Sequence, residues 1–230
     1  MDKFPLRNEE QEKKYAIRNY SLQKDIMFIH IPKCAGSFIK RTFIKNQFFF
    51  SFVPPGSSKG LTNHLPAHII NSCPQFKNTR NFIFVRNPYD RLASNWFWQT
   101  KHPSGDPKKV NSTLKKFKNF NDFVLELPNL SFSANPFIEK DITHHFSLQK
   151  DWANEKTIFI GKKENLLEDI NNFCALINEP PLKDISLDIH PSDLGTAHQK
   201  NYLNLYDRKM IDVVNQVYEE DFIFLNYDFL

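Results

Sequence analysis

Residues 25–39 read Asp-Ile-Met-Phe-Ile-His-Ile-Pro-Lys-Cys-Ala-Gly-Ser-Phe-Ile. The apolar run 26–31 predicts a short buried strand, which Pro32 ends because proline has no backbone N–H for a neighbouring strand. We expect Gly36 to let the backbone turn after the strand, so that successive amides face one point where a helix begins. The segment is therefore predicted to bind an anion at the end of a strand.

Two side chains strengthen the prediction of an anion site. Lys33 adds a full positive charge to the partial charge of the free amides at a helix start, and Ser37 offers a hydroxyl group. In the common nucleotide-binding P-loop the lysine follows the second glycine, whereas here Lys33 precedes the glycine at position 36. The pattern thus indicates a phosphate site that differs from that of the nucleoside triphosphatases.

A second segment, residues 81–98, repeats the strand-to-helix pattern as Asn-Phe-Ile-Phe-Val-Arg-Asn-Pro-Tyr-Asp-Arg-Leu-Ala-Ser-Asn-Trp-Phe-Trp. The apolar run 82–85 predicts a strand, and Asn87 is a favourable N-cap for the helix that follows. Arg86 at the strand end and Ser94 on the helix are suited to hold one dianion between them. The sequence therefore predicts two phosphate sites.

Together the two segments resemble the motifs of the carbohydrate sulfotransferases, especially the branch of the heparan sulfate 2-O-sulfotransferases and their bacterial relatives. The first motif of that family reads approximately His-Ile-Pro-Lys-Thr-Gly-Gly-Thr-Ser and binds the 5'-phosphosulfate end of 3'-phosphoadenosine 5'-phosphosulfate (PAPS). The resemblance implies cofactor binding by Lys33, Cys34, Ala35, Gly36, Ser37 and Phe38. Cys34, Ala35 and Phe38 depart from the family residues, which leaves the backbone amides available at these positions.

The second motif of the family reads Val-Arg-Asn-Pro-Tyr-x-Arg-Leu-x-Ser and binds the 3'-phosphate, which implies this role for Arg86 and Ser94. Weaker similarities continue towards the end of the chain. Residues 160–166 are similar to a Gly-x-x-Glu-Asn-Leu segment of the family, and residues 218–227 to its Tyr-x-x-Asp-Phe ending. His145, which precedes Gln149 by four positions, resembles a His-x-x-x-Gln stretch of relatives. The likeness thus covers most of the chain from about residue 25.

The resemblance implies an in-line transfer of a sulfuryl group from PAPS to an acceptor hydroxyl, with PAP as product and without a metal. Lys33 is the candidate that stabilises the leaving group. His64 is the candidate base, because relatives carry a histidine between the two motifs and because an ordinary imidazole pKa suits proton removal at neutral pH. His68 and His145 are the alternatives. The acceptor implied by the resemblance is a carbohydrate, although the sequence does not define it.

Strand-length apolar runs alternate with stretches that favour helices, which predicts an α/β fold. The expected strands are residues 26–31, 82–85 and 157–160, with 48–53 as a further candidate. A stripe of apolar residues at helical spacing predicts a last helix over residues 210–218. We expect a three-layer sandwich with a central parallel sheet, the P-loop-like fold of the resembled family. Residues 1–24 are interpreted as a polar extension and 25–230 as a single domain.

Composition restricts the class of protein. The chain has 230 residues and a formal net charge of +4, which suits an anionic ligand but is too small to indicate a nucleic-acid-binding protein. Its 3 cysteines show no paired spacing, which favours free thiols in a reducing compartment. No apolar run is long enough for a membrane span, and the N-terminal residues lack the apolar core of a signal peptide. We therefore expect a cytoplasmic protein without a membrane span.

Other interpretations of the same residues remain open at this stage. A nucleotide-dependent phosphotransferase or hydrolase of similar ancestry would need an acidic residue where the second strand ends, and Arg86 stands there instead. A non-catalytic module that binds nucleotide or glycan is the other alternative. Arg86 has a structural role if it pairs with Asp90, and Trp96 and Trp98 either stack on adenine or pack in the core.

Overall fold

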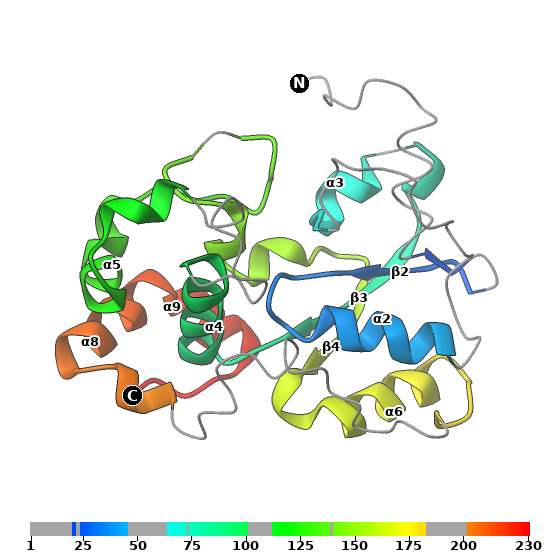
Figure 1. Cartoon of the computed structure of the whole chain (residues 1–230). Helices are drawn as coiled ribbons and strands as arrows, with labels where there is room; N and C mark the ends of the chain where they lie inside the picture. Colours follow the sequence, from blue (N-terminus) through cyan, green and yellow to red (C-terminus); the bar gives the residue numbers. More distant parts are fainter. Residues whose placement is uncertain are drawn as a thin grey trace.

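The computed structural model describes residues 20–21, 24–45, 64–72, 74–100, 112–138, 140–182 and 202–230. Within these ranges the sheet has the order β1-β2-β3-β4, in which β2, β3 and β4 are parallel and β1 is antiparallel to β2 (Figure 1). The strands are β1 Tyr20–Ser21, β2 Ile26–Ile29, β3 Arg80–Val85 and β4 Thr157–Lys162. The prediction of an α/β fold with a parallel sheet is confirmed. The candidate strand at 48–53 lies outside the described residues.

Helices α2 (Gly36–Lys45) and α6 (Leu166–Leu176) cover one face of the sheet (Figure 1). The core between them is aromatic, because alternate residues of β2 and β3 point to this face. Phe82 stacks on Phe173 of α6 with ring centroids 4.0 Å apart. Gly161 of β4 is required here, since a Cβ at this position would lie 2.4 Å from the Phe84 ring. The glycine of the Gly-x-x-Glu-Asn-Leu segment therefore serves sheet packing.

The opposite face of the sheet packs against helix α3 (Ala67–Asn71) and a short helix, η7 (Lys150–Trp152). The strands contribute the residues that alternate with those of the aromatic core, and Trp152 is fully buried among them. The residues that β2, β3, α3 and η7 contribute to this core are Met27, Ile29, Ile83, Val85, Ala67, Ile69, Ile70 and Trp152. Both faces of β2 and β3 are thus covered, as expected for parallel strands, whereas Ile160 of β4 is exposed.

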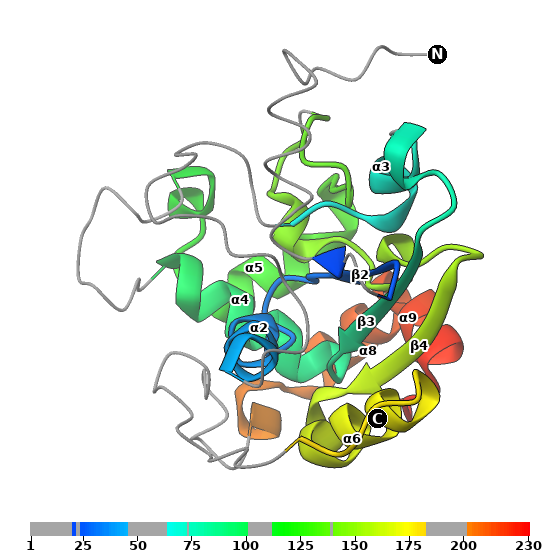
Figure 2. The same ribbon diagram turned by 90° about the vertical axis from the view of Figure 1, so that its right-hand side faces the viewer.

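A second helical core lies beside the sheet and is built by four helices (Figures 1 and 2). These helices are α4 (Pro88–Thr100), α5 (Phe120–Glu126), α8 (Arg208–Val217) and α9 (Glu219–Leu225). Trp96 stacks on Phe123 in this core with ring centroids 4.8 Å apart, so its role is packing. The predicted last helix is confirmed as α8, with Asp207 as its N-cap, but the chain forms α9 after Tyr218.

Short helical turns connect the main elements. They are η2 (Pro74–Phe76), η4 (Ser112–Lys116), η5 (Leu127–Asn129), η6 (His144–Phe146), η8 (Lys163–Asn165) and η10 (Tyr202–Leu205). No helix in the described ranges has the length and apolar character that crossing a membrane requires.

The carboxyl ends of β2 and β3 lie side by side, because Ile29 pairs with Ile83 in parallel register. The chain enters α2 after β2 and α4 after β3. The turn before α2 and the residue Arg86 therefore lie at one edge of the sheet, which is where open α/β sheets bind ligands.

Candidate active site

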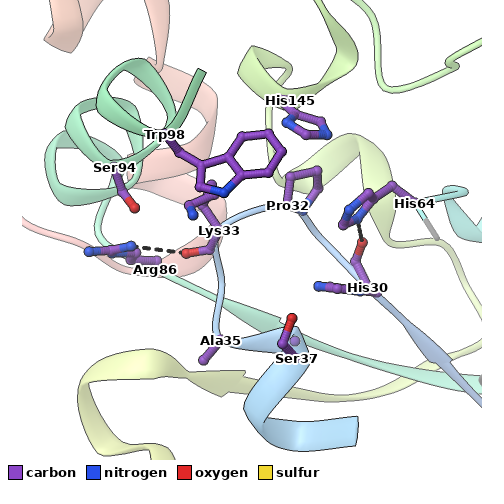
Figure 3. Close-up of a pocket in the computed structure, with 11 residues that line it drawn as sticks. His30, Pro32, Lys33, Ala35, Ser37, His64, Arg86, Ser94, Trp98 and His145 are labelled. Atoms are coloured by element: carbon purple, nitrogen blue, oxygen red, sulfur yellow. Dashed lines mark hydrogen bonds between the residues drawn. The ribbon is translucent and has the colours of Figure 1, made fainter. Parts of the chain in front are cut away.

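A cavity of about 150 Å³ lies at this edge of the sheet (Figure 3). Its walls come from the turn after β2, the start of α2, the residue after β3, helix α4, the segment before α3, and η6. The lining residues are His30, Pro32, Lys33, Ala35, Gly36, Ser37, His64, Arg86, Ser94, Trp98 and His145. Lysine, arginine and histidine side chains occur among them but no carboxylate does, so the lining is suited to an anionic ligand.

The turn after β2 bends at residues other than the one that the sequence indicated. Lys33 and Ala35 have left-handed backbone conformations, with φ of 67° and 61°. Gly36 is needed for a different reason: a Cβ there would lie 1.9 Å from Cδ2 of His30. The expectation that Gly36 provides the turn was wrong, and this glycine instead makes room for an imidazole ring.

The turn leaves backbone amides free at the start of α2. Along this helix, the first backbone amide with a recorded hydrogen bond is that of Ile39, which donates to the Ala35 carbonyl at 3.0 Å. Within the described part of the chain no acceptor is recorded for the amides of Gly36, Ser37 and Phe38. These three N–H groups, together with the partial positive charge of the helix start, have the chemistry that suits an anion.

Two residues of the predicted phosphosulfate site direct their side chains into the core. Phe38 is 3 % exposed and packs in the aromatic core beneath α2. Cys34 is 1 % exposed, and its thiol donates to Oε1 of Gln149 at 3.2 Å. Burial raises the pKa of the Cys34 thiol to about 12, which excludes a thiolate nucleophile at neutral pH. At both positions only the backbone is available to a ligand.

Arg86 is fully buried and forms a two-pronged ion pair with Asp90, Nε to Oδ2 at 2.5 Å and Nη2 to Oδ1 at 2.6 Å. The interpretation that Arg86 pairs with Asp90 is confirmed, yet Arg86 also lines the cavity. Its Nη1 donates to the Lys33 carbonyl at 3.0 Å (Figure 3), so Arg86 also holds the turn. Lys163 is a second cation on Asp90, at 3.4 Å, and the cluster keeps a net positive charge.

Ser94 lies two turns into α4 and lines the cavity. It is 2 % exposed, and its Oγ has no hydrogen-bond partner within the described residues. A buried hydroxyl without a partner is costly, and a ligand oxygen in the cavity would supply the missing partner. Ser94 thus lines the same cavity as Arg86, and its role as a ligand-binding hydroxyl stays a prediction.

The side chains of Trp98 and Lys33 lie beside each other in the lining of the cavity (Figure 3). The Nζ of Lys33 lies 5.1 Å from the ring centroid of Trp98, which is within cation–π range. Of the two tryptophans weighed from the sequence, Trp98 contributes to the site and Trp96 to the helical core.

His64 lines the cavity, and its Nδ1 lies 2.8 Å from the His30 carbonyl oxygen. Burial lowers the pKa of His64 to about 3, so the ring is neutral at pH 7. His68, one alternative base, is exposed on α3 and does not line the cavity. His145, the other alternative, does line it, with its ring centroid 5.1 Å from that of His64.

Some residues that hold the site were not singled out by sequence reasoning. Arg91 donates to the Pro32 carbonyl at 3.2 Å and to the His145 carbonyl at 2.9 Å, which joins the turn to η6. Gln149 accepts from the Arg86 amide at 2.9 Å. His30 lines the cavity although it was read only as part of a strand. Each stands at a matched position of a family motif, and that is the signal that could have identified them.

Within the described residues no group of three or more His, Cys, Asp or Glu side chains is arranged to hold a metal ion. The comparisons with known proteins give one result. A family model described as Sulfotransferase family matches residues 19–228. No curated protein and no solved structure matches the chain.

Proposed function

Since the chain belongs to the sulfotransferase family, we propose that it transfers the sulfuryl group of PAPS to a hydroxyl group of an acceptor, which is a carbohydrate. The lining of the cavity supports the proposal: the start of α2 with its free amides, Lys33, Arg86 and Ser94 all line it, and no carboxylate does. PAPS has anionic groups at both ends of its adenosine, and these donors and cations suit anionic groups. PAP leaves as the product.

We assign the 5'-phosphosulfate end to the turn and the start of α2. The amides of Gly36, Ser37 and Phe38 have no partner in the described part of the chain, and Ala35 and Ser37 line the same wall. Helix starts of this kind bind phosphate and sulfate through the amides and the helix dipole. Lys33, which lines the cavity next to these amides, is placed to stabilise the charge that develops on the bridging oxygen during transfer.

We assign the 3'-phosphate to Ser94 and Arg86. The unpartnered hydroxyl of Ser94 is the direct contact. Arg86 already donates hydrogen bonds to Asp90 and to the Lys33 carbonyl. Its proposed role is therefore to supply positive charge near the 3'-phosphate and to hold the turn in place. Lys163 offsets the charge of Asp90 as well, and the local field remains favourable for a dianion.

The base in this proposal is His64. A carbonyl oxygen can only accept a hydrogen bond, so the contact with the His30 carbonyl places the His64 proton on Nδ1. Its Nε2 then keeps a lone pair that can take the proton of the acceptor hydroxyl. Positioning and electrostatics supply the remaining acceleration, by analogy with phosphoryl transfer.

The finer classification is part of the proposal. The motifs support a P-loop-like three-layer fold and the branch of the heparan sulfate 2-O-sulfotransferases with their bacterial relatives, from which the carbohydrate acceptor is carried over. Cys34 and Cys174 are free thiols, which agrees with a reducing compartment and supports a cytoplasmic location.

The experiment that tests the function is transfer of labelled sulfate from PAPS to a panel of polysaccharides and small glycosides, in the presence of a metal chelator. We expect labelled product with at least one glycan and none without protein. Stabilisation by ATP with Mg²⁺ but not by PAP would instead support a phosphotransferase. Binding of PAP without transfer to any acceptor would support a binding module.

A further inference from the structure

Three imidazoles line the cavity, and their ring nitrogens divide them into two kinds. His64 has its Nδ1 at 2.8 Å from a carbonyl oxygen, which fixes the proton on that nitrogen. His30 and His145 differ, because the Nδ1 of each is buried and lacks a hydrogen-bond partner among the described residues. The same residue type thus occurs in two hydrogen-bonding states within one cavity.

The state of His30 and His145 follows from the cost of a buried unpartnered N–H. In each of the two rings, a proton on Nδ1 would be buried with no hydrogen-bond acceptor near it among the described residues. A proton on Nε2 lies on the other side of the ring, where a ligand can accept it. In His30 this nitrogen lies beside the start of α2, since a Cβ on Gly36 would be 2.0 Å from it. His30 thus presents Nε2 next to the free amides of α2.

The surroundings keep these rings neutral. The pKa values of His30, His64 and His145 are lowered, chiefly because the rings are buried and further because imidazoles and cations lie near them. The charged groups that act on the three rings are Lys33, Lys40 and Arg91, and His144 adds a fourth imidazole. A neutral imidazole has one N–H, so the position of the proton decides whether Nε2 donates or accepts.

We propose that His30 and His145 bind the phosphosulfate group of the sulfate donor through Nε2–H hydrogen bonds, while His64 accepts the proton of the acceptor hydroxyl. The inference rests on the proposed function and assigns two further binding residues to it. His145 lines the same cavity, its ring lies 5.1 Å from that of His64 and 5.7 Å from that of Trp98, centroid to centroid, and its backbone is held by Arg91. The proposal separates residues that hold the sulfate donor from the residue that moves the proton.

Glutamine and phenylalanine substitutions test this division. The amide N–H of glutamine can replace the Nε2–H of histidine as a hydrogen-bond donor, but the amide cannot act as a base. Phenylalanine can neither donate the hydrogen bond nor accept a proton. His145→Gln should keep the dissociation constant of PAP within about threefold of the wild type, whereas His145→Phe should weaken PAP binding about tenfold or more. His30→Gln and His30→Phe should behave in the same way. At His64 both substitutions should abolish turnover with little change in PAP binding.

Calorimetric titration with PAP and single-turnover transfer from PAPS provide the two readouts. His68→Gln and His68→Phe are the matched controls, because His68 lies on α3 outside the cavity, and neither should change PAP binding. Nitrogen-15 NMR of the histidines gives a readout that requires no variant: it should show Nδ1–H for His64 and Nε2–H for His30 and His145.

The inference is overturned if His145→Phe, with folding verified by circular dichroism, binds PAP as tightly as the wild type, or if NMR places the proton of His145 on Nδ1. Equal losses for His145→Gln and His145→Phe would also contradict it, because a purely steric role would then suffice. A wild-type protein that fails to bind PAP contradicts the proposed function itself, and the NMR result still decides the proton positions.

Discussion

At the residue scale, Lys33 is the most direct test of the chemistry. We expect Lys33→Met to lower the rate of sulfuryl transfer by about 100-fold or more, because the charge on the bridging oxygen loses its cation. The dissociation constant of PAP should rise by less than about tenfold, since the amides of α2 remain. Single-turnover kinetics and calorimetry measure the two quantities separately. A Lys33→Met variant with the wild-type rate would remove this residue from the mechanism.

Substitutions at the neighbouring residues Gly36 and Ala35 are expected to change the stability in opposite directions. Gly36→Ala should lower the free energy of unfolding by about 1–3 kcal/mol, because the new Cβ meets the His30 ring. Ala35→Gly should leave it unchanged or raise it by up to about 1 kcal/mol, since Ala35 already has a left-handed conformation. Urea denaturation of both variants checks the pair. If Ala35→Gly proved the more destabilising of the two, the described turn would be incorrect.

At the scale of elements, much of the architecture was predictable because each element depends on local pattern. The apolar runs after residues 25 and 81 lie in β2 and β3, and Asn87 accepts from the Tyr89 amide at 3.0 Å, as an N-cap does. The pairing of Tyr20–Ser21 with β2 was not predicted, because a strand of two residues has no periodic pattern. Helix α9 was not predicted, because the apolar stripe that indicated the last helix ends at Tyr218.

Glu164 shows how separate elements are joined at the site. Its Oε1 accepts from the Asn87 amide at 2.7 Å and its Oε2 from the Tyr227 hydroxyl at 2.8 Å. The carboxylate thus satisfies an amide at the start of α4 and holds the segment after α9. The partners of Glu164 lie in other elements, so they could not be read from the segment around Glu164 alone.

We expect Glu164→Ala to lower the free energy of unfolding by about 1 kcal/mol, because α4 loses a charged partner at its start. Chemical denaturation measures this change. Glu155→Ala is the control, because Glu155 is exposed and its ion pair, with neighbouring Lys156, is 3.7 Å long, and it should change stability by less than about 0.5 kcal/mol. Equal effects for the two variants would argue against a capping role for Glu164.

At the scale of the whole molecule, the site forms where separate parts of the chain meet. Lys33, Arg86 and Ser94 were predictable because two motifs each place a strand end before a helix. The position of His145 depends on contacts with Arg91 and Asn95 across 50 or more residues, through its carbonyl oxygen. A single sequence does not reveal such contacts, so His145 was expected only as an alternative base.

The histidine cluster also predicts how the whole protein responds to acid. The pKa is lowered to about 3 for His64 and about 4 for His144, and well below its ordinary value for His30 and His145. The unfolded chain therefore binds more protons than the folded one once the pH falls below the ordinary imidazole pKa of about 6.5. The contribution of these neutral histidines to the free energy of unfolding is therefore fully present above this pH and is lost progressively below it.

Each such histidine contributes a slope of about 1.4 kcal/mol per pH unit in this range. The free energy of unfolding should therefore fall by at least about 1.4 kcal/mol from pH 6 to pH 5. Urea unfolding curves at about pH 7.5, 6.5, 6 and 5 measure this dependence, with the urea concentration at the midpoint of unfolding recorded at each pH. Constant stability between pH 6.5 and pH 5 would mean that the rings are not buried as described.

The central claim is that one cavity binds both ends of a doubly phosphorylated adenosine. A crystal structure with PAP tests it most directly. The account predicts the 5'-phosphate on the amides of Gly36, Ser37 and Phe38 beside Lys33, and the 3'-phosphate on Ser94 beside Arg86. PAP bound at another place, or in this cavity with its two ends exchanged, would contradict the account.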